Sequence, residues 1–198
     1  MYRPVQTFSF ALDALLWVKH AGWFHCTSLV LHSACCAAAV FAFRLLIGAK
    51  PAVASAIILA IHPALSEGAL SLLARGNQSY TLFSLLAVGF FVRIVRPLDR
   101  RHIFCLVGLA LAFFSKEPAI ALVALLPLIQ LSFKRPRELQ TEHTLSLYLP
   151  LLASAAFFLL VRAHVVGSPT VFPYWGGSFW STIQMQAKVS VIYISLLV

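Results

Sequence analysis

Long apolar segments alternate with short polar or charged connections along nearly the whole chain. A helix that spans a lipid bilayer needs about 20 mostly apolar residues. Several segments approach that length, and they end at charged residues, glycine or proline. The segments expected to be helical are residues 23–47, 52–65, 79–95, 102–114, 118–133 and 145–161, and a further one begins near residue 187.

This pattern predicts an all-α fold, a polytopic bundle of about six or seven transmembrane helices. Some segments are shorter than a full span, and short helices can end in polar cavities lined by protein. We expect a single transmembrane domain over residues 1–198, with the hydrophobic helices in residues 22–161. Residues 162–186, rich in Gly, Pro, Ser and aromatic residues, are expected to form an outer loop, and residues 187–198 to start a further helix.

Residues 1–20 have a different pattern. Pro4 suits the first turn of a helix. Asp13 falls away from the apolar positions, which lie near one helix face: Val5, Phe8, Leu12, Leu15 and Leu16. The spacing predicts an amphipathic helix lying along the membrane surface, with an ordinary packing helix as the alternative.

The composition excludes a soluble globular domain. The chain is 61% hydrophobic and 11% charged, and its mean hydropathy is +0.89. A soluble domain is about half apolar and about a quarter charged. So little charge could not cover a water-exposed surface of this size. The chain is therefore expected to be an integral membrane protein, of the bacterial inner-membrane or the endoplasmic-reticulum type.

The net charge of +9 does not indicate a nucleic-acid partner. The basic residues lie at the ends of apolar segments, which is typical of membrane topology. The expected partners are membrane lipid and, as a further class, other membrane protein subunits. The four cysteines lack zinc-site spacing, and no metal site, Gly-rich phosphate loop or nucleophile triad is recognised.

Alternating the helices across a membrane sorts the basic residues into two groups. The larger group clusters in three short connections, so the positive-inside rule places these loops in the cytoplasm. This group is Arg44, Lys50, Arg93, Arg96, Arg100, Arg101, Lys134, Arg135 and Arg137.

With that orientation, other polar residues converge on the opposite, outer face. They are Arg3, His62, Ser66, Glu67, Arg75, Asn77, Gln78, Ser115, Lys116, Glu117, Arg162 and His164. Each one alone is explained as an interfacial charge that reaches water. As a set on one face, they predict a site, because ionisable groups near helix ends in a membrane are expensive. A basic group beside a carboxylate can hold a phosphate or position a polar substrate.

Several motifs in fixed order carry a family resemblance. They are Tyr2-Arg3-Pro4-Val5, the helix from Phe24-His25 to His32, His62-Pro63-Ala64-Leu65-Ser66-Glu67, Ala74-Arg75-Gly76-Asn77 and Ser115-Lys116-Glu117. With these motifs the sequence resembles the GT-C-type membrane glycosyltransferases, particularly the protein O-mannosyltransferase-like group that often carries tetratricopeptide repeats. The likeness covers nearly the whole chain, which would be truncated at its N- and C-terminal ends relative to the family.

The resemblance implies a catalytic cavity on the non-cytoplasmic side. It also implies transfer of a sugar from a polyprenyl-phosphate-linked donor to an acceptor hydroxyl. On this basis Arg3, Arg75, Lys116 and Arg162 would bind the donor phosphate. His62, Glu67, Asn77 and Glu117 would line the same cavity, where His62 and Glu67 could orient the acceptor or, as a weaker alternative, a metal. We expect Arg75, Lys116 and Glu67 to surround a shared hollow.

No catalytic residue and no cofactor is assigned. In the family, the general base comes from acidic residues of a first outer loop, which would precede Tyr2. The acid of the Arg-Gly-Asn neighbourhood is here Asn77, which cannot act as a base. The chain is thus interpreted as a piece or a divergent member of a membrane glycosyltransferase. The alternative is a non-catalytic structural transmembrane subunit of a larger membrane complex, derived from that fold.

Overall fold

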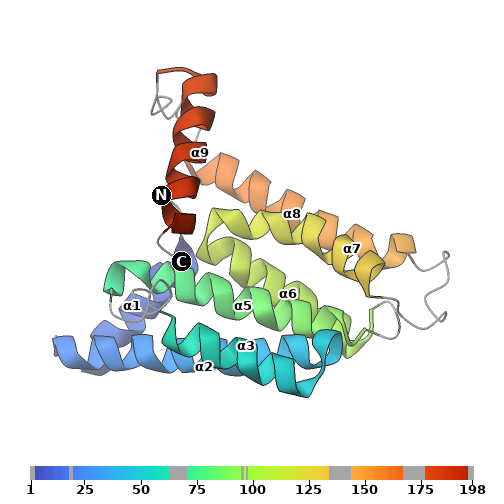
Figure 1. Cartoon of the computed structure of the whole chain (residues 1–198), viewed down its shortest axis with the longest axis horizontal. Helices are drawn as coiled ribbons and strands as arrows, with labels where there is room; N and C mark the ends of the chain where they lie inside the picture. The colour runs from blue at the N-terminus through green and yellow to red at the C-terminus, as the bar shows by residue number, and fades with distance from the viewer. Residues whose placement is uncertain are drawn as a thin grey trace. The chain divides into compact units, whose positions relative to one another are not determined.

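The computed structural model describes residues 3–17, 20–62, 71–94, 96, 98–133, 144–166 and 177–195. In these residues the regular secondary structure is helical and no strand occurs, which confirms the all-α fold class. The α-helices in Figure 1 are α1 (Pro4–Trp17), α2 (Ala21–Ile47), α3 (Ala49–Ile61), α5 (Arg75–Phe91), α6 (Arg100–Ser115), α7 (Leu122–Ser132), α8 (Thr144–Val166) and α9 (Phe179–Ser195). The 3-10 helices η1 (Leu72–Ala74) and η2 (Glu117–Ala121) precede α5 and α7.

The chain divides into two compact units, Met1–Leu160 (unit 1) and Val161–Val198 (unit 2). In unit 1, α5 packs against both α2 and α6, and α3 packs against α2. The helices α2 and α3 run antiparallel and meet at Gly48 (Figure 1). Gly48 has φ of 87°, a backbone conformation that glycine adopts without the steric cost of a Cβ atom.

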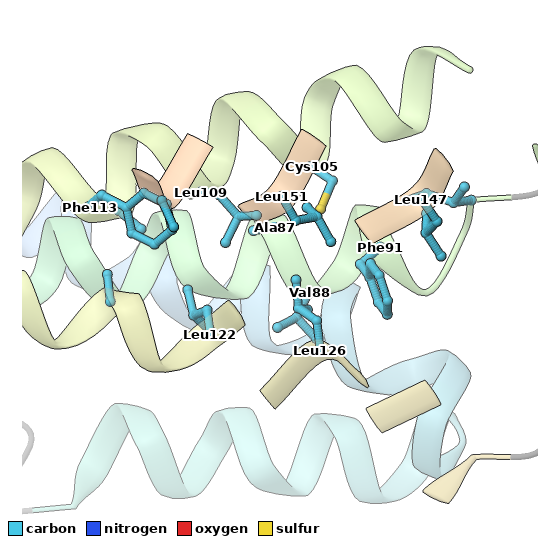
Figure 2. Close-up of a cluster of buried hydrophobic side chains, with 14 of the residues drawn as sticks. Ala87, Val88, Phe91, Cys105, Leu109, Phe113, Leu122, Leu126, Leu147 and Leu151 are labelled. Atoms are coloured by element: carbon cyan, nitrogen blue, oxygen red, sulfur yellow. The ribbon is translucent and has the colours of Figure 1, made fainter. Parts of the chain in front are cut away.

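The core of unit 1 is apolar and is built from one face of each packed helix. Figure 2 shows Ala87, Val88 and Phe91 of α5 close to side chains of α6, α7 and α8. On α8 the buried positions recur at helical spacing, at Leu147, Leu151, Ala155 and Phe158.

Two glycines bring the helices of unit 1 into close contact. A Cβ on Gly108 of α6 would lie 3.2 Å from the Phe83 oxygen and the Ala87 nitrogen of α5. A Cβ on Gly89 would lie 2.4 Å from the Phe41 ring and 3.3 Å from the Cα of Ala42 on α2. Small residues at these positions let helix backbones approach closely, as is common between membrane helices.

The helix α9 of unit 2 begins at Phe179, earlier than the predicted start near Ala187. Ser178 explains the earlier start, because its Oγ accepts a hydrogen bond of 3.2 Å from the Ser181 backbone N–H. The predicted outer loop, 162–186, is also shortened at its other end, where α8 continues to Val166.

The other helices begin and end within a few residues of the predicted segments. The segment predicted at 79–95 is α5 and ends earlier, at Phe91. The segment predicted at 118–133 is divided between η2 and α7. The end of the segment predicted at 52–65 lies outside the described residues.

The outer surface of unit 1 is apolar, and several buried side chains are polar. Large hydrophobic side chains such as Val30, Ile61 and Leu149 are more than 60% exposed. Asp13, Arg75 and Gln78 are at most 5% exposed. This distribution fits a lipid environment, where the solvent is apolar and polar groups must be satisfied internally.

Two described helices are long and apolar enough to cross a membrane, at Gly22–Ile47 and Leu145–Val165. Shorter apolar helices occur at Ala49–Ile61 and Glu117–Ser132. The total of six or seven membrane helices therefore remains a prediction.

The helix α1 packs with its polar side inward. Asp13 is 3% exposed, whereas Phe8, Leu15 and Leu16 are more than 60% exposed. The side of α1 that carries Asp13 contacts the other helices. The position of α1 at a membrane surface stays a prediction.

The contact at Gly108 yields a testable prediction. Gly108→Leu should destabilise the fold by about 1–3 kcal/mol, because the added side chain meets the backbone of α5. Thermal unfolding of the purified protein in detergent measures the effect. The matched control is Val107→Leu, at a position 49% exposed, which should change stability by less than about 0.5 kcal/mol. Equal melting temperatures for the two variants would contradict the close helix approach.

Candidate functional site

One end of unit 1 gathers the ends of several helices with their polar residues. Arg75 begins α5, Lys116 caps the C-terminus of α6, and His62 caps the C-terminus of α3. The His32 ring of α2 lies 3.3 Å from the Ala60 oxygen, which ties the end of α3 to the N-terminal half of α2. We call this end of unit 1 the polar end.

A buried ion pair holds α1 onto this end. The Arg75 guanidinium donates a hydrogen bond to Oδ2 of Asp13, and the two side chains are 0% and 4% exposed. It also donates to the Phe24 backbone oxygen at 2.7 Å and to Oγ of Ser28 at 3.3 Å. Oδ1 of Asp13 accepts a hydrogen bond of 2.9 Å from Thr27. The pair therefore joins α1, α2 and α5.

Two aromatic rings lie beside the Arg75 guanidinium. Its Cζ lies 4.4 Å from the centre of the Phe10 ring and 5.9 Å from that of Phe24. A guanidinium over an aromatic face is stabilised by the ring quadrupole, more so where water is excluded. Arg75 thus has a carboxylate, a carbonyl, a hydroxyl and two rings as neighbours.

A second ion pair connects the start of α1 to η2. Nη2 of Arg3 lies 3.4 Å from Oε2 of Glu117, and the side chains are 20% and 22% exposed. Nε of Arg3 is buried without a hydrogen-bond partner among the described residues. This pair is more accessible than the pair of Arg75 with Asp13.

Lys116 has no carboxylate partner among the described residues. Its Nζ donates a hydrogen bond to Oδ1 of Asn77, a neutral group at the start of α5. Its backbone is extended, with φ of −160°, so α6 ends here and the 3-10 helix η2 follows. Within the described part of the chain, Lys116 therefore adds a positive charge whose side-chain contact is a neutral group.

An open apolar groove lies beside these polar groups. It has a volume of about 530 Å³ and is lined by Pro4, Val5, Phe8, Phe83, Leu111 and Phe114. Pro4 follows Arg3 in the chain, and Phe114 is separated from Lys116 by one residue. The groove therefore begins next to the two cations, with α1 on one side and α5 and α6 on the other.

The structure brings together only some of the residues predicted for the site. Arg3 pairs with Glu117, and Lys116 contacts Asn77. Glu67 lies outside the described residues, so the predicted hollow shared with Arg75 and Lys116 stays a prediction. His62 is half-buried, and Arg162 lies near the end of α8, in unit 2.

Within the described ranges, no three His, Cys, Asp or Glu side chains are grouped in a way that could hold a metal ion. Asp13 is the residue that sequence reasoning missed. It is the first acid of a basic chain and lies within an apolar helix. A carboxylate in such surroundings needs a cationic partner, so its presence indicates a buried ion pair. It does not identify the partner residue.

The comparison with known families decides the relationship of the chain. The family model for dolichyl-phosphate-mannose-protein mannosyltransferases matches residues 21–167. The chain belongs to this mannosyltransferase family. No curated protein and no solved structure gives a significant match.

Membership in the mannosyltransferase family agrees with the resemblance to GT-C-type membrane glycosyltransferases. The match and the two long apolar helices support a membrane glycosyltransferase-like protein. The tetratricopeptide-associated group and the truncation relative to the family stay predictions. The match includes Arg75, Asn77, Lys116 and Glu117. It does not include α1, the helix that contributes Asp13, because α1 ends before residue 21.

The buried pair yields a prediction on stability. Asp13→Leu should destabilise the fold by about 3–5 kcal/mol, because it leaves the Arg75 charge buried without its carboxylate. Asp13→Leu combined with Arg75→Met should recover most of this loss, since the double variant removes both charges. Unfolding in mixed detergent micelles measures both. If the double variant were less stable than Asp13→Leu alone, the pair would not be the main constraint on Arg75.

Proposed function

We propose that this chain binds a polyprenyl-phosphate-linked sugar at the polar end of unit 1. There it would take part in transferring the sugar to an acceptor hydroxyl. The observation that carries the proposal is Lys116, a cation without a carboxylate partner among the described residues, beside an apolar groove of about 530 Å³. Family membership supports a mannosyltransferase-type reaction.

Lys116 suits the donor phosphate electrostatically. Its described partner, Asn77, is neutral, so no anion among the described residues would have to be displaced when a phosphate oxygen approaches the ammonium. A lysine acts on phosphate as a point charge with rotatable donors. During transfer the phosphate leaves with growing negative charge, which a fixed cation stabilises in a site of low dielectric.

Arg3 would supply a second cation. It is partly exposed and is paired with Glu117 at 3.4 Å, which is long for a charge-assisted hydrogen bond. Its buried Nε lacks a partner among the described residues and is a donor that a phosphate oxygen would satisfy. Glu117 and Asn77 would then line the cavity, as the resemblance implies.

The groove would hold the first part of the polyprenyl chain. Its lining residues are proline, aliphatic and phenylalanine side chains, which match a branched hydrocarbon. A polyprenyl-phosphate has an anionic head and a long apolar tail. The head would contact Lys116, and the tail would lie in the adjoining apolar groove.

Arg75 has a different part in this proposal from the one expected on resemblance. Its guanidinium is buried against Asp13, so we infer that it positions α1, and with it Arg3 and one wall of the groove. His62 and Glu67 keep their predicted roles of lining the cavity. The role predicted for Arg162 stays a prediction, since Arg162 lies in unit 2.

The membrane orientation is part of the proposal. The polar end would face the outer side, and the basic loops would face the cytoplasm. The membrane would be of the bacterial inner-membrane or the endoplasmic-reticulum type.

The second candidate function is a non-catalytic subunit of a membrane complex. The observation that favours it is that Asp13 and Glu117, the described carboxylates of the polar end, are both paired with arginine. Activation of an acceptor hydroxyl needs a positioned base that can take the proton. In this case the polar end would bind the donor or only stabilise the fold, and partner subunits would carry the base.

Binding of polyprenyl-phosphate-mannose to the purified protein in detergent tests the proposal. Lys116→Gln should weaken binding about tenfold, because it removes one hydrogen bond from a charged donor. Lys116→Arg should retain most of the affinity. Lys188→Gln, which removes one exposed charge from α9, is the matched control and should leave affinity unchanged.

Equal affinities for Lys116→Gln and Lys188→Gln would overturn the proposed phosphate site. A parallel assay of mannose transfer to a hydroxyl acceptor separates the two candidate functions. Donor binding with transfer supports the enzyme, and donor binding without transfer by the purified chain supports the non-catalytic subunit.

A further inference from the structure

The end of unit 1 opposite the polar end carries three arginines from adjoining segments. Arg44 lies in the last turn of α2, Arg93 follows α5, and Arg101 lies in the first turn of α6. Because α2 has 27 residues, its two ends are about 40 Å apart. We call the three arginines the arginine corner.

Hydrogen bonds to backbone oxygens hold two residues of the arginine corner, Arg93 and Arg101, in place. The Arg93 guanidinium donates to the Gly89 oxygen at 2.6 Å and to the Phe41 oxygen at 2.7 Å, and its Cζ lies 3.8 Å from the centre of the Phe41 ring. Arg101 donates to the Arg93 oxygen at 2.7 Å. The positive charges of Arg44 and Arg101 both act on Arg93.

No described carboxylate pairs with these arginines. The two ion pairs in the described part of the chain are those of Asp13 and Glu117, at the polar end. Asp99 is near in sequence, and its Oδ1 caps α6 by accepting from the His102 N–H at 2.7 Å. Three like charges gathered at one end of the unit attract an anion.

Exposed apolar side chains flank the arginine corner. Leu45, Leu98 and Phe104 are 54%, 65% and 53% exposed. Leu98 has φ of 61°, which is unfavourable for a side chain of this size, and its N–H donates to Nδ1 of His102 at 2.9 Å. The strained turn thus displays a leucine next to Arg101.

We propose that the arginine corner binds the headgroup of an anionic phospholipid, with the acyl chains lying against Leu45, Leu98 and Phe104. A lipid explains the cations and the exposed apolar side chains together, whereas an acidic protein surface would account for the cations alone. The chain belongs to a membrane family, so lipid surrounds its apolar surface. The bound lipid would screen the three charges and hold α2, α5 and α6 together at this end.

The arginine corner and the donor site use different residues at opposite ends of α2. The lipid proposal therefore stands or falls independently of the proposed sugar transfer.

Native mass spectrometry of the full chain tests the proposal. The protein, released from detergent, is exposed to an equal mixture of phosphatidylglycerol and phosphatidylcholine. The wild-type chain should retain phosphatidylglycerol in preference. Arg44→Gln and Arg101→Gln should each weaken that binding about fivefold, while Arg44→Lys and Arg101→Lys should retain most of it.

Lys188→Gln is the control for loss of one positive charge and should bind like the wild type. Arg44 makes no hydrogen bond to a described residue, so Arg44→Gln tests the charge without disturbing the turn that Arg101 supports. Equal retention of the two lipids, or the same loss in Arg44→Gln as in Lys188→Gln, would overturn the proposal.

Discussion

The buried contact between Asp13 and Arg75 determines how the polar end is assembled. It fixes α1 across α2 and α5, and α1 in turn carries Arg3 to Glu117 and forms one wall of the groove. A charge in a membrane protein is costly unless it is paired and hydrogen-bonded. Here the guanidinium has a carboxylate, a backbone oxygen, a hydroxyl and aromatic rings around it. Stability and site geometry therefore depend on the same pair of side chains.

The cationic side chains at the two ends of unit 1 have different partners. At the polar end, Arg3 and Arg75 are neutralised by carboxylates, and Lys116 has a neutral partner. At the opposite end, neither of the ion pairs in the described part of the chain involves Arg44, Arg93 or Arg101. This difference suits a selective site for one anionic ligand at the first end and a headgroup contact at the second. Both proposed sites are located where helices end, because a charge in the apolar middle of a membrane helix is costly.

The helices were predictable from the sequence, since an apolar segment with charged or proline-containing ends reports both helix length and boundaries. The start of α9 was not, because the cap at Ser178 lies within a stretch whose composition resembles a loop. Helical periodicity separated Asp13 from the apolar positions of α1 but carried no information on which side would be buried. Its partner, Arg75, is 62 residues away, and local spacing does not encode such a pairing. The contacts of Arg3 with Glu117 and of Lys116 with Asn77 depend on that same tertiary arrangement.

The separation between Asp13 and Arg75 also bears on how the protein is made. Asp13 leaves the ribosome first, and its partner follows after 62 further residues, roughly 3–12 s later at ordinary rates of synthesis. During that interval an unpaired carboxylate is best accommodated in the aqueous interface. The N-terminal helix would therefore dock only after α2 and α3 have been made and the start of α5, with Arg75, has emerged. The groove would then acquire its α1 wall no earlier than the synthesis of Arg75, 62 residues after Asp13.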